Sequence, residues 1–187
     1  EAAKRGAQML QELLTEPVSE LLVLILRLAT VGRARSAWSE ALQALSSLRG
    51  IVPENQRGHR QLAKDLDAFA RRFNRAFPTP PQTAEAVHTV IQSILGFLGR
   101  DALISANPAY AQGDWLSEVE HSVALHLQAS SAGRTDWSAA LDAYEGTHAL
   151  PLMTLHKSKG LEYHTVIFVG LDDSAWWSFQ QDAAEST

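Results

Sequence analysis

The sequence contains no cysteine among its 187 residues. This absence excludes a disulfide framework, a thiolate metal site and a cysteine nucleophile, and it is compatible with the reducing cytoplasm, where we expect the protein. Long apolar runs are also missing. The most apolar segment, residues 21–28, contains Arg27 and is far shorter than the roughly 20 residues that span a bilayer. We therefore predict a buried helix there and no membrane partner.

Basic residues are fewer than acidic ones, with 16 Lys and Arg against 21 Asp and Glu, which gives a net charge of −5. This balance argues against wrapping of nucleic acid by the whole chain, so any such contact must be regional. The first eleven residues show no apolar run behind a basic start, so we predict no signal peptide. Because the chain begins on Glu1 and ends soon after a predicted strand, we expect a piece of a longer protein.

Apolar residues recur at helical spacing over most of the chain, from residue 1 to about 147. Asp114 and Asp136 are placed as helix caps, and helices are expected to stop at Gly50 and Pro78. The apolar stripes run over residues 38–48, 62–77, 87–98, 116–127 and 137–144. The pattern changes after Thr147, so we predict a mostly α fold, with a helical domain over 1–147 and a small α/β piece over 148–187.

The α/β piece is predicted from two short apolar runs with a polar turn between them. Leu152–Leu155 is the first run, Ser158, Lys159 and Gly160 lie in the turn, and Val166–Gly170 is the β-branched second run. The polar residues follow the carboxyl end of the first strand, which is where ligands bind in open α/β sheets. Two strands cannot form a stable sheet alone, so we expect this piece to pack against the helices or against further parts of a longer protein.

Ten residues of this segment follow the pattern Leu-Met-Thr-x-His-x-Ser/Ala-Lys-Gly-Leu-Glu-aromatic. They are Leu152, Met153, Thr154, His156, Ser158, Lys159, Gly160, Leu161, Glu162 and Tyr163. In this pattern the chain resembles the UvrD/Rep-type superfamily 1 DNA helicases, because the pattern is similar to the fifth helicase motif of that family. The resemblance covers residues 150–173. It implies that residues 148–187 belong to the second RecA-like (2A) domain and that the helices before them form the 2B insertion.

The resemblance implies a nucleotide contact on one side of the motif. Glu162 would accept hydrogen bonds from an ATP ribose hydroxyl, as carboxylates do in other nucleotide folds. Gly160 would let the backbone approach the nucleotide, since it has no Cβ. Lys159 would place positive charge beside phosphates.

The resemblance implies a DNA contact on the other side. Thr154 and His156 would hydrogen-bond the sugar-phosphate backbone of a single strand without reading its sequence, and Lys157 would add charge there. The structural alternative is a connection in which Thr, Ser and Gly only shape the turn and the lysines are solvated. Ten matches in one register favour the helicase interpretation.

Two expected parts of such an enzyme are absent from the sequence. It has no G-x-x-x-x-G-K-[ST] phosphate loop and no acidic strand end of the Asp-Glu type that holds Mg²⁺. ATP and Mg²⁺ would thus be cofactors of a full-length protein, whose N-terminal RecA-like domain is an expected partner. We predict that residues 1–187 are inert alone. A recombination-type helicase with an attached nuclease stays open as a rival.

A local basic region lies within this acidic chain. Residues 57–75 hold six cations against two aspartates, a local charge of +4. The cations are Arg57, Arg60, Lys64, Arg71, Arg72 and Arg75. Arg71, Arg72 and Arg75 lie off the apolar stripe, so they are candidates to grip duplex DNA phosphates, as helical insertions of the family can. The alternative is a solvated helix face.

Two alternatives belong to other functional classes. Three Glu-x-x-His pairs, a spacing typical of di-iron helical bundles, suggest a di-metal enzyme. They are Glu85/His88, Glu118/His121 and Glu145/His148. Helical phase argues against this site, because Glu118 and His121 are opposite the apolar face of their helix. The other alternative is that the helical region is a protein-interaction module.

Overall fold

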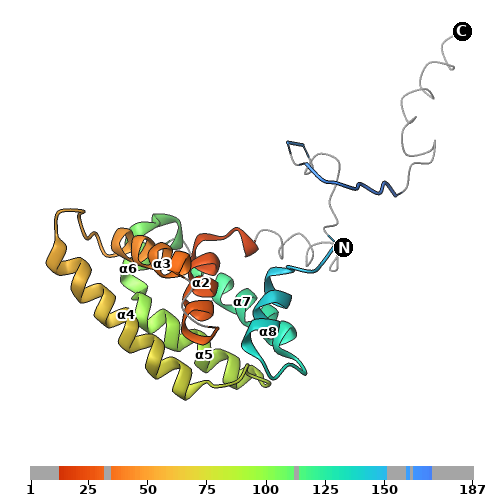
Figure 1. Ribbon diagram of the computed structural model, residues 1–187, viewed down its shortest axis with the longest axis horizontal. Helices are drawn as coiled ribbons and strands as arrows, with labels where there is room; N and C mark the ends of the chain where they lie inside the picture. Colours follow the sequence, from red (N-terminus) through yellow and green to blue (C-terminus); the bar gives the residue numbers. More distant parts are fainter. Residues whose placement is uncertain (1–12, 32–34, 112–113, 151–158, 161, 170–187) are drawn as a thin grey trace, which may run out of the picture. The chain divides into compact units, whose positions relative to one another are not determined.

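The computed structural model describes residues 13–31, 35–111, 114–150, 159–160 and 162–169. The chain divides into two units, residues 1–150 and 151–187, where the sequence places the boundary near residue 148. The first unit is a bundle of helices (Figure 1). Its elements are α2 (Pro17–Thr30), α3 (Arg35–Leu48), α4 (Gln56–Ala76), α5 (Ala84–Leu98), α6 (Arg100–Ala106), the 3-10 helix η1 (Pro108–Ala111), α7 (Trp115–Ser131) and α8 (Trp137–Glu145).

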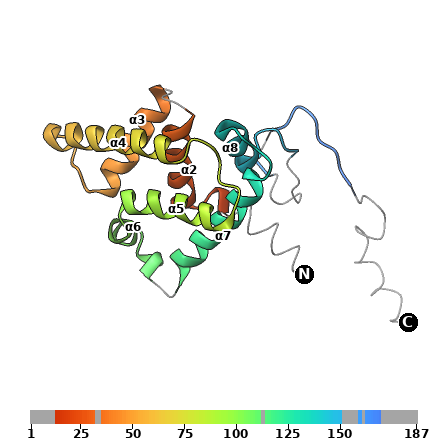
Figure 2. The ribbon, with the colours of Figure 1, turned by 90° about the horizontal axis from the view of Figure 1, so that it is seen from below.

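The central element is α2, which packs against α3, α4, α5, α7 and α8 (Figures 1 and 2). Leu22, Ile25 and Leu28 are among its buried side chains, and this confirms the buried helix predicted over residues 21–28. A helix that is apolar on most sides is stable only when other elements surround it. Its first turn is fixed by Pro17 and by the Glu16 carboxylate, which accepts a hydrogen bond of 2.8 Å from the Ser19 amide.

The five predicted stripes form α3, α4, α5, α7 and α8, so the mostly α prediction is confirmed for the described residues. Asp136 caps α8 by accepting a hydrogen bond of 2.9 Å from the Ala139 amide. Asp114 precedes α7 but makes no capping hydrogen bond with its side chain. The helix α6 was not predicted. It has seven residues and a single fully buried one, Leu103, which is too short a pattern to detect.

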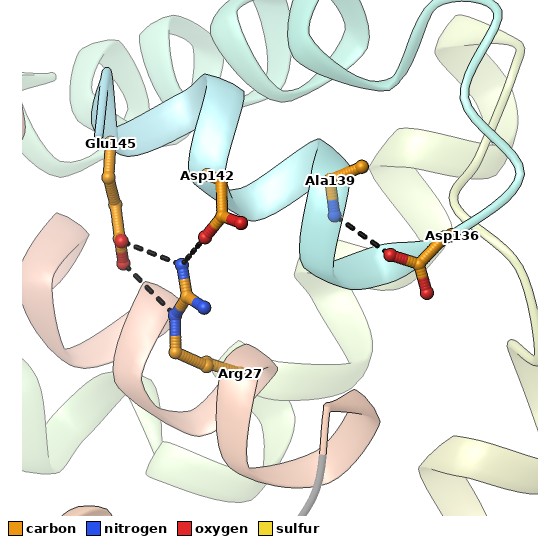
Figure 3. Close-up of polar contacts among 5 residues, drawn as sticks. All are labelled: Arg27, Asp136, Ala139, Asp142 and Glu145. Atoms are coloured by element: carbon orange, nitrogen blue, oxygen red, sulfur yellow. Dashed lines mark hydrogen bonds and ion pairs between the residues drawn. The ribbon is translucent and has the colours of Figure 1, made fainter. Parts of the chain in front are cut away.

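The helix α8 is tied to α2 by one charged contact (Figure 3). The Arg27 Nη2 donates to Asp142 Oδ1 at 3.0 Å and to Glu145 Oε2 at 2.7 Å, and its Nε donates to Glu145 Oε1 at 3.3 Å. Burial lowers the pKa of Arg27, but the hydrogen bonds and charges of Glu145 and Asp142 outweigh it and raise the pKa. The guanidinium therefore joins two carboxylates of α8 to the central helix.

The strand predicted over residues 166–170 is not formed at Val166–Val169, and the residues that the structure describes contain no strand. Ile167 is 80% exposed and Val169 is 88% exposed. A strand needs a neighbour to pair its amide and carbonyl groups, and an apolar one needs covered faces. The first predicted strand, residues 152–155, lies outside the described residues. Among the helices described, none is both long enough and apolar enough to cross a membrane.

Candidate nucleotide and nucleic-acid interface

The described part of the helicase-like motif contains a turn whose residues are exposed to solvent. Lys159 and Gly160 form the turn, and Lys159, Gly160 and Glu162 are exposed. Gly160 has φ +87°, a conformation that a side chain would strain, and among the described residues no atom beyond its chain neighbours lies within 4 Å of where a Cβ would be. The predicted DNA contacts Thr154, His156 and Lys157 lie outside the described residues.

This turn presents three kinds of chemistry to solvent within four residues. The Glu162 carboxylate accepts hydrogen bonds from hydroxyl groups, the Lys159 ammonium attracts phosphate, and Gly160 leaves its backbone open to close approach. These are groups that can hold the ribose and phosphates of a nucleotide. They do not make a metal site, because only one carboxylate is present.

After this turn, four consecutive apolar side chains are exposed: Val166 by 56%, Ile167 by 80%, Phe168 by 57% and Val169 by 88%. Contiguous exposed apolar side chains are typical of surfaces that bind another element or a partner. Their β-branched and aromatic composition is typical of a strand buried inside a sheet.

The predicted basic residues lie on α4, where all six cations are exposed. The helix begins at the cap Asn55, whose side chain accepts a hydrogen bond of 2.9 Å from the Gly58 amide. Its opposite side is buried through Leu62, Leu66, Phe69, Ala70 and Phe73. The Arg71 guanidinium pairs with Asp67 one turn earlier. The hydrophobic stripe thus fixes which way the cations face.

Two grooves flank α4 and divide the predicted arginines between them. Arg71 and Arg75 line a groove of about 400 Å³ with the last residues of α2. Arg72 lines a groove of about 560 Å³ with residues of α5 and with Arg49. The sequence predicted the three arginines as one cluster, whereas the structure places Arg72 on the other flank from Arg71 and Arg75.

Arg49 is a residue of this surface that the sequence did not reveal. Its guanidinium carbon lies 5.1 Å from the centre of the Phe97 ring, and its Nη2 donates to the Phe97 carbonyl at 3.0 Å. It also lies 3.9 Å from the Asp65 carboxylate. No local signal places Arg49 beside Phe97, because the two are 48 residues apart.

A polar cluster at the start of α2 was also not predicted. Glu16 accepts a hydrogen bond from the Tyr110 hydroxyl, and Tyr144 lies 3.1 Å from the Ser19 hydroxyl. Burial, together with the hydrogen bond and charge of Glu16, raises the pKa of Tyr110 to about 12. Burial raises the pKa of Tyr144 to about 12 as well. Both phenols therefore keep their protons at pH 7, and their hydroxyls join η1 and α8 to the start of α2.

The Glu-x-x-His pairs do not converge. All six of their residues are exposed. Within the part of the chain that the structure describes, no three His, Asp or Glu side chains come close enough to hold a metal ion.

The chain matches no protein-family model, no curated protein and no solved structure in the comparisons that we made. The resemblance to helicases therefore depends on the ten residues of the motif.

Proposed function

We propose that this chain is part of a UvrD/Rep-type superfamily 1 DNA helicase and couples ATP binding to movement along single-stranded DNA. The observation that carries the proposal is the match of ten residues in one register between Leu152 and Tyr163. Isolated Ser-Lys-Gly turns are common, but ten fixed spacings are specific.

Two features of the described residues support the proposal. Lys159, Gly160 and Glu162 are open to solvent, as a nucleotide contact requires. The exposed run Val166–Val169 has the composition of a strand in the parallel sheet of a RecA-like domain, where further strands would cover it. The finer assignment of residues 148–187 to the 2A domain and of 1–147 to the 2B insertion belongs to this proposal.

In this function the residues hold and orient two ligands. Glu162 accepts hydrogen bonds from the ribose, Lys159 lies beside the phosphates, and Gly160 gives them room. Thr154, His156 and Lys157 contact the backbone of the DNA strand. ATP, when bound with Mg²⁺, supplies the free energy of its hydrolysis. The sequence has neither the phosphate loop nor the Asp-Glu pair, so the N-terminal RecA-like domain must supply the Mg²⁺ ligands.

The test compares two substitutions in the full-length enzyme. Glu162→Ala should raise the KM for ATP about tenfold, because it removes a ribose contact made before the reaction. His156→Ala should instead raise about tenfold the DNA concentration that half-stimulates turnover. Glu118→Ala, on an exposed face of α7, is the control and should change neither.

Unaltered kinetics in both variants would contradict the proposal. DNA-stimulated ATP turnover by residues 1–187 alone would instead contradict the prediction that these residues are inert alone, since this chain has no phosphate loop.

A further inference from the structure

The groove between α4 and α5 belongs to the helical unit and contains no residue of the helicase-like motif. Its volume is about 560 Å³, and residues 65–77 line one side of it, which is about 18 Å at 1.5 Å per residue. The other side is lined by α5 around Gly96, and Arg49, directly after α3, lines the groove as well. The two helices lie side by side in both views of the ribbon (Figures 1 and 2). We call this space the α4–α5 groove.

Phenylalanine rings form the floor of the α4–α5 groove. Phe69 of α4 stacks on Phe97 of α5 with 4.2 Å between the ring centres, and the Arg49 guanidinium carbon lies 5.1 Å from the centre of the Phe97 ring. Both faces of this ring are therefore occupied, so it offers no stacking platform to a nucleic-acid base. Phe77 and Phe97 are only partly buried, so the floor offers apolar surface to an aliphatic or aromatic side chain.

Small residues form the edges of the α4–α5 groove. Ala68 and Ala76 on α4 and Gly96 on α5 are exposed. Beyond the neighbours of Gly96 in its own helix, no described atom lies within 4 Å of where a Cβ would be. How closely two helices approach depends on the side chains at their contact, so small edges admit a third helix. A length of about 18 Å fits about 12 residues of such a helix.

Two arginines bring positive charge to the α4–α5 groove about two helical turns apart. Arg49 Nη1 lies 3.9 Å from Asp65 Oδ2, which is too far for a hydrogen bond. Arg72 follows Asp65 by seven residues, or about 10 Å along α4. Within the described part of the chain, no hydrogen bond or ion pair holds the Arg72 guanidinium. Asp65 is the only acidic residue of the lining, and it also accepts a hydrogen bond of 2.9 Å from Gln61, so the groove has a net positive charge.

We propose that the α4–α5 groove binds an amphipathic helix of a partner protein that carries two carboxylates seven residues apart. On such a helix, positions i and i+7 lie on one face about 10 Å apart, which matches the separation of Arg49 and Arg72 along α4. Apolar side chains at i+3 and i+4 lie between them on the same face and cover the phenylalanine floor. Nucleic acid would supply the negative charge but no side chains for the floor. The inference depends on the groove alone and holds whether or not the chain belongs to a helicase.

The test begins with a selection from a display library of helical peptides of about 14 residues, with the full chain as the target. The peptides share an alanine-rich frame with one face randomised, so the selection itself decides which side chains are preferred. We expect enriched peptides to carry Asp or Glu at i and i+7 and Leu, Ile or Phe at i+3 or i+4. Fluorescence anisotropy of the labelled peptides then gives their Kd for each variant of the chain.

The first pair of variants tests the charges of the α4–α5 groove. Arg49→Gln/Arg72→Gln should raise the Kd about tenfold, because two partly exposed ion pairs with the peptide are lost. The charge-matched control is Arg57→Gln/Arg60→Gln, at exposed positions of α4 that do not line the groove. It should change the Kd by less than about twofold.

The second pair of variants tests the space. Gly96→Trp should raise the Kd at least about tenfold, because the indole fills the α4–α5 groove, and the open surroundings of Gly96 accept the ring without a clash. The matched control is Ala129→Trp, at an exposed position of α7, and it should leave the Kd unchanged. Thermal melts followed by circular dichroism establish that each variant is folded.

Four results would overturn the proposal. They are enriched peptides without the acidic pair, equal weakening by the groove variants and their controls, displacement of the peptide by duplex DNA, and self-association of the chain that Gly96→Trp abolishes. The last result would make a second copy of the chain the occupant of the α4–α5 groove. None of these measurements involves Glu162 or ATP, so this proposal and the helicase assignment can fail separately.

Discussion

Ser19 on α2 and Tyr144 on α8 share a buried hydrogen bond, with 3.1 Å between their hydroxyl oxygens, although 125 residues separate them in the chain. Ser19 is 1% exposed and Tyr144 is 2% exposed. Burial, with a smaller effect from the charge of Glu16, raises the pKa of Tyr144 to about 12, so the phenol keeps its proton at neutral pH. This bond and the Arg27 contacts join the last helix of the bundle to its centre.

Substitution of Tyr144 by Phe should lower the free energy of unfolding by about 1–2 kcal/mol, because the Ser19 hydroxyl then loses this hydrogen bond while it stays buried. Adding Ser19→Ala to Tyr144→Phe should recover part of the loss. Urea denaturation of the two single variants and the double variant measures the coupling. Strict additivity of the two substitutions would show that the bond has no net effect.

Arg27→Met should lower the free energy of unfolding by about 1 kcal/mol at low salt and by less at 1 M salt. Its ion pairs are partly exposed, so solvent and salt screen them. The control Arg72→Met changes an exposed cation of α4 and should stay within about 0.5 kcal/mol of the wild type. A loss for Arg27→Met that is equal at both salt concentrations would mean that the arginine acts through packing of its stem.

The helices could be predicted because the apolar stripes and the residues that end helices indicate the same boundaries. In α4 the apolar residues repeat at helical spacing from Leu62 to Phe73, and the helix ends at Ala76, two residues before the stop expected at Pro78. The long-range contacts could not be predicted. Nothing local to Ser19 or Arg27 identifies a partner on α8, since such pairs follow from how the helices pack. The prediction of a strand was wrong at Val166–Val169. A strand forms only when its backbone pairs with another segment, and that segment is not adjacent in sequence.

For the candidate site the sequence predicts the chemistry of the side chains but not their layout. The motif predicts nucleotide contacts for Glu162, Gly160 and Lys159 from residue type, and these contacts stay predictions; the left-handed turn at Gly160 agrees with a glycine there. Charge counting identified the basic region of α4. It did not show that Arg72 lies on a different flank from Arg71, which depends on where α2 and α5 pack against the helix.

Gly96→Ala should raise the free energy of unfolding by about 0.5–1 kcal/mol. Gly96 lies in α5, and an added Cβ would meet no atom within 4 Å, so alanine gains helix propensity without a clash. The matched control is Gly146→Ala at the end of α8, where φ is +66°. That change should lower the free energy of unfolding by about 1 kcal/mol, because alanine disfavours the left-handed conformation. Thermal melts of both variants test the pair, and a stabilised Gly146→Ala would contradict the cap geometry.

Acidification should destabilise the bundle in part through His126. Its Nε2 lies 2.8 Å from the Tyr144 carbonyl oxygen, and because a carbonyl only accepts, Nε2 carries a proton in the neutral ring. Burial lowers the pKa of His126, and the bond to the Tyr144 carbonyl offsets this in part. Below the ordinary histidine pKa of about 6.5, the unfolded chain therefore binds a proton more readily than the folded chain does. The free energy of unfolding decreases as the pH is lowered through this range.

The variant His126→Gln isolates this effect from the other titrating groups. The glutamine amide can still donate to the Tyr144 carbonyl but has no charge to gain. Urea denaturation at pH 7.5, 6.5 and 5.5 should show the wild type losing more free energy of unfolding than the variant, with the difference growing below pH 6.5. Curves that stay parallel over this range would mean that the ring takes up a proton in the folded state as easily as in the unfolded chain.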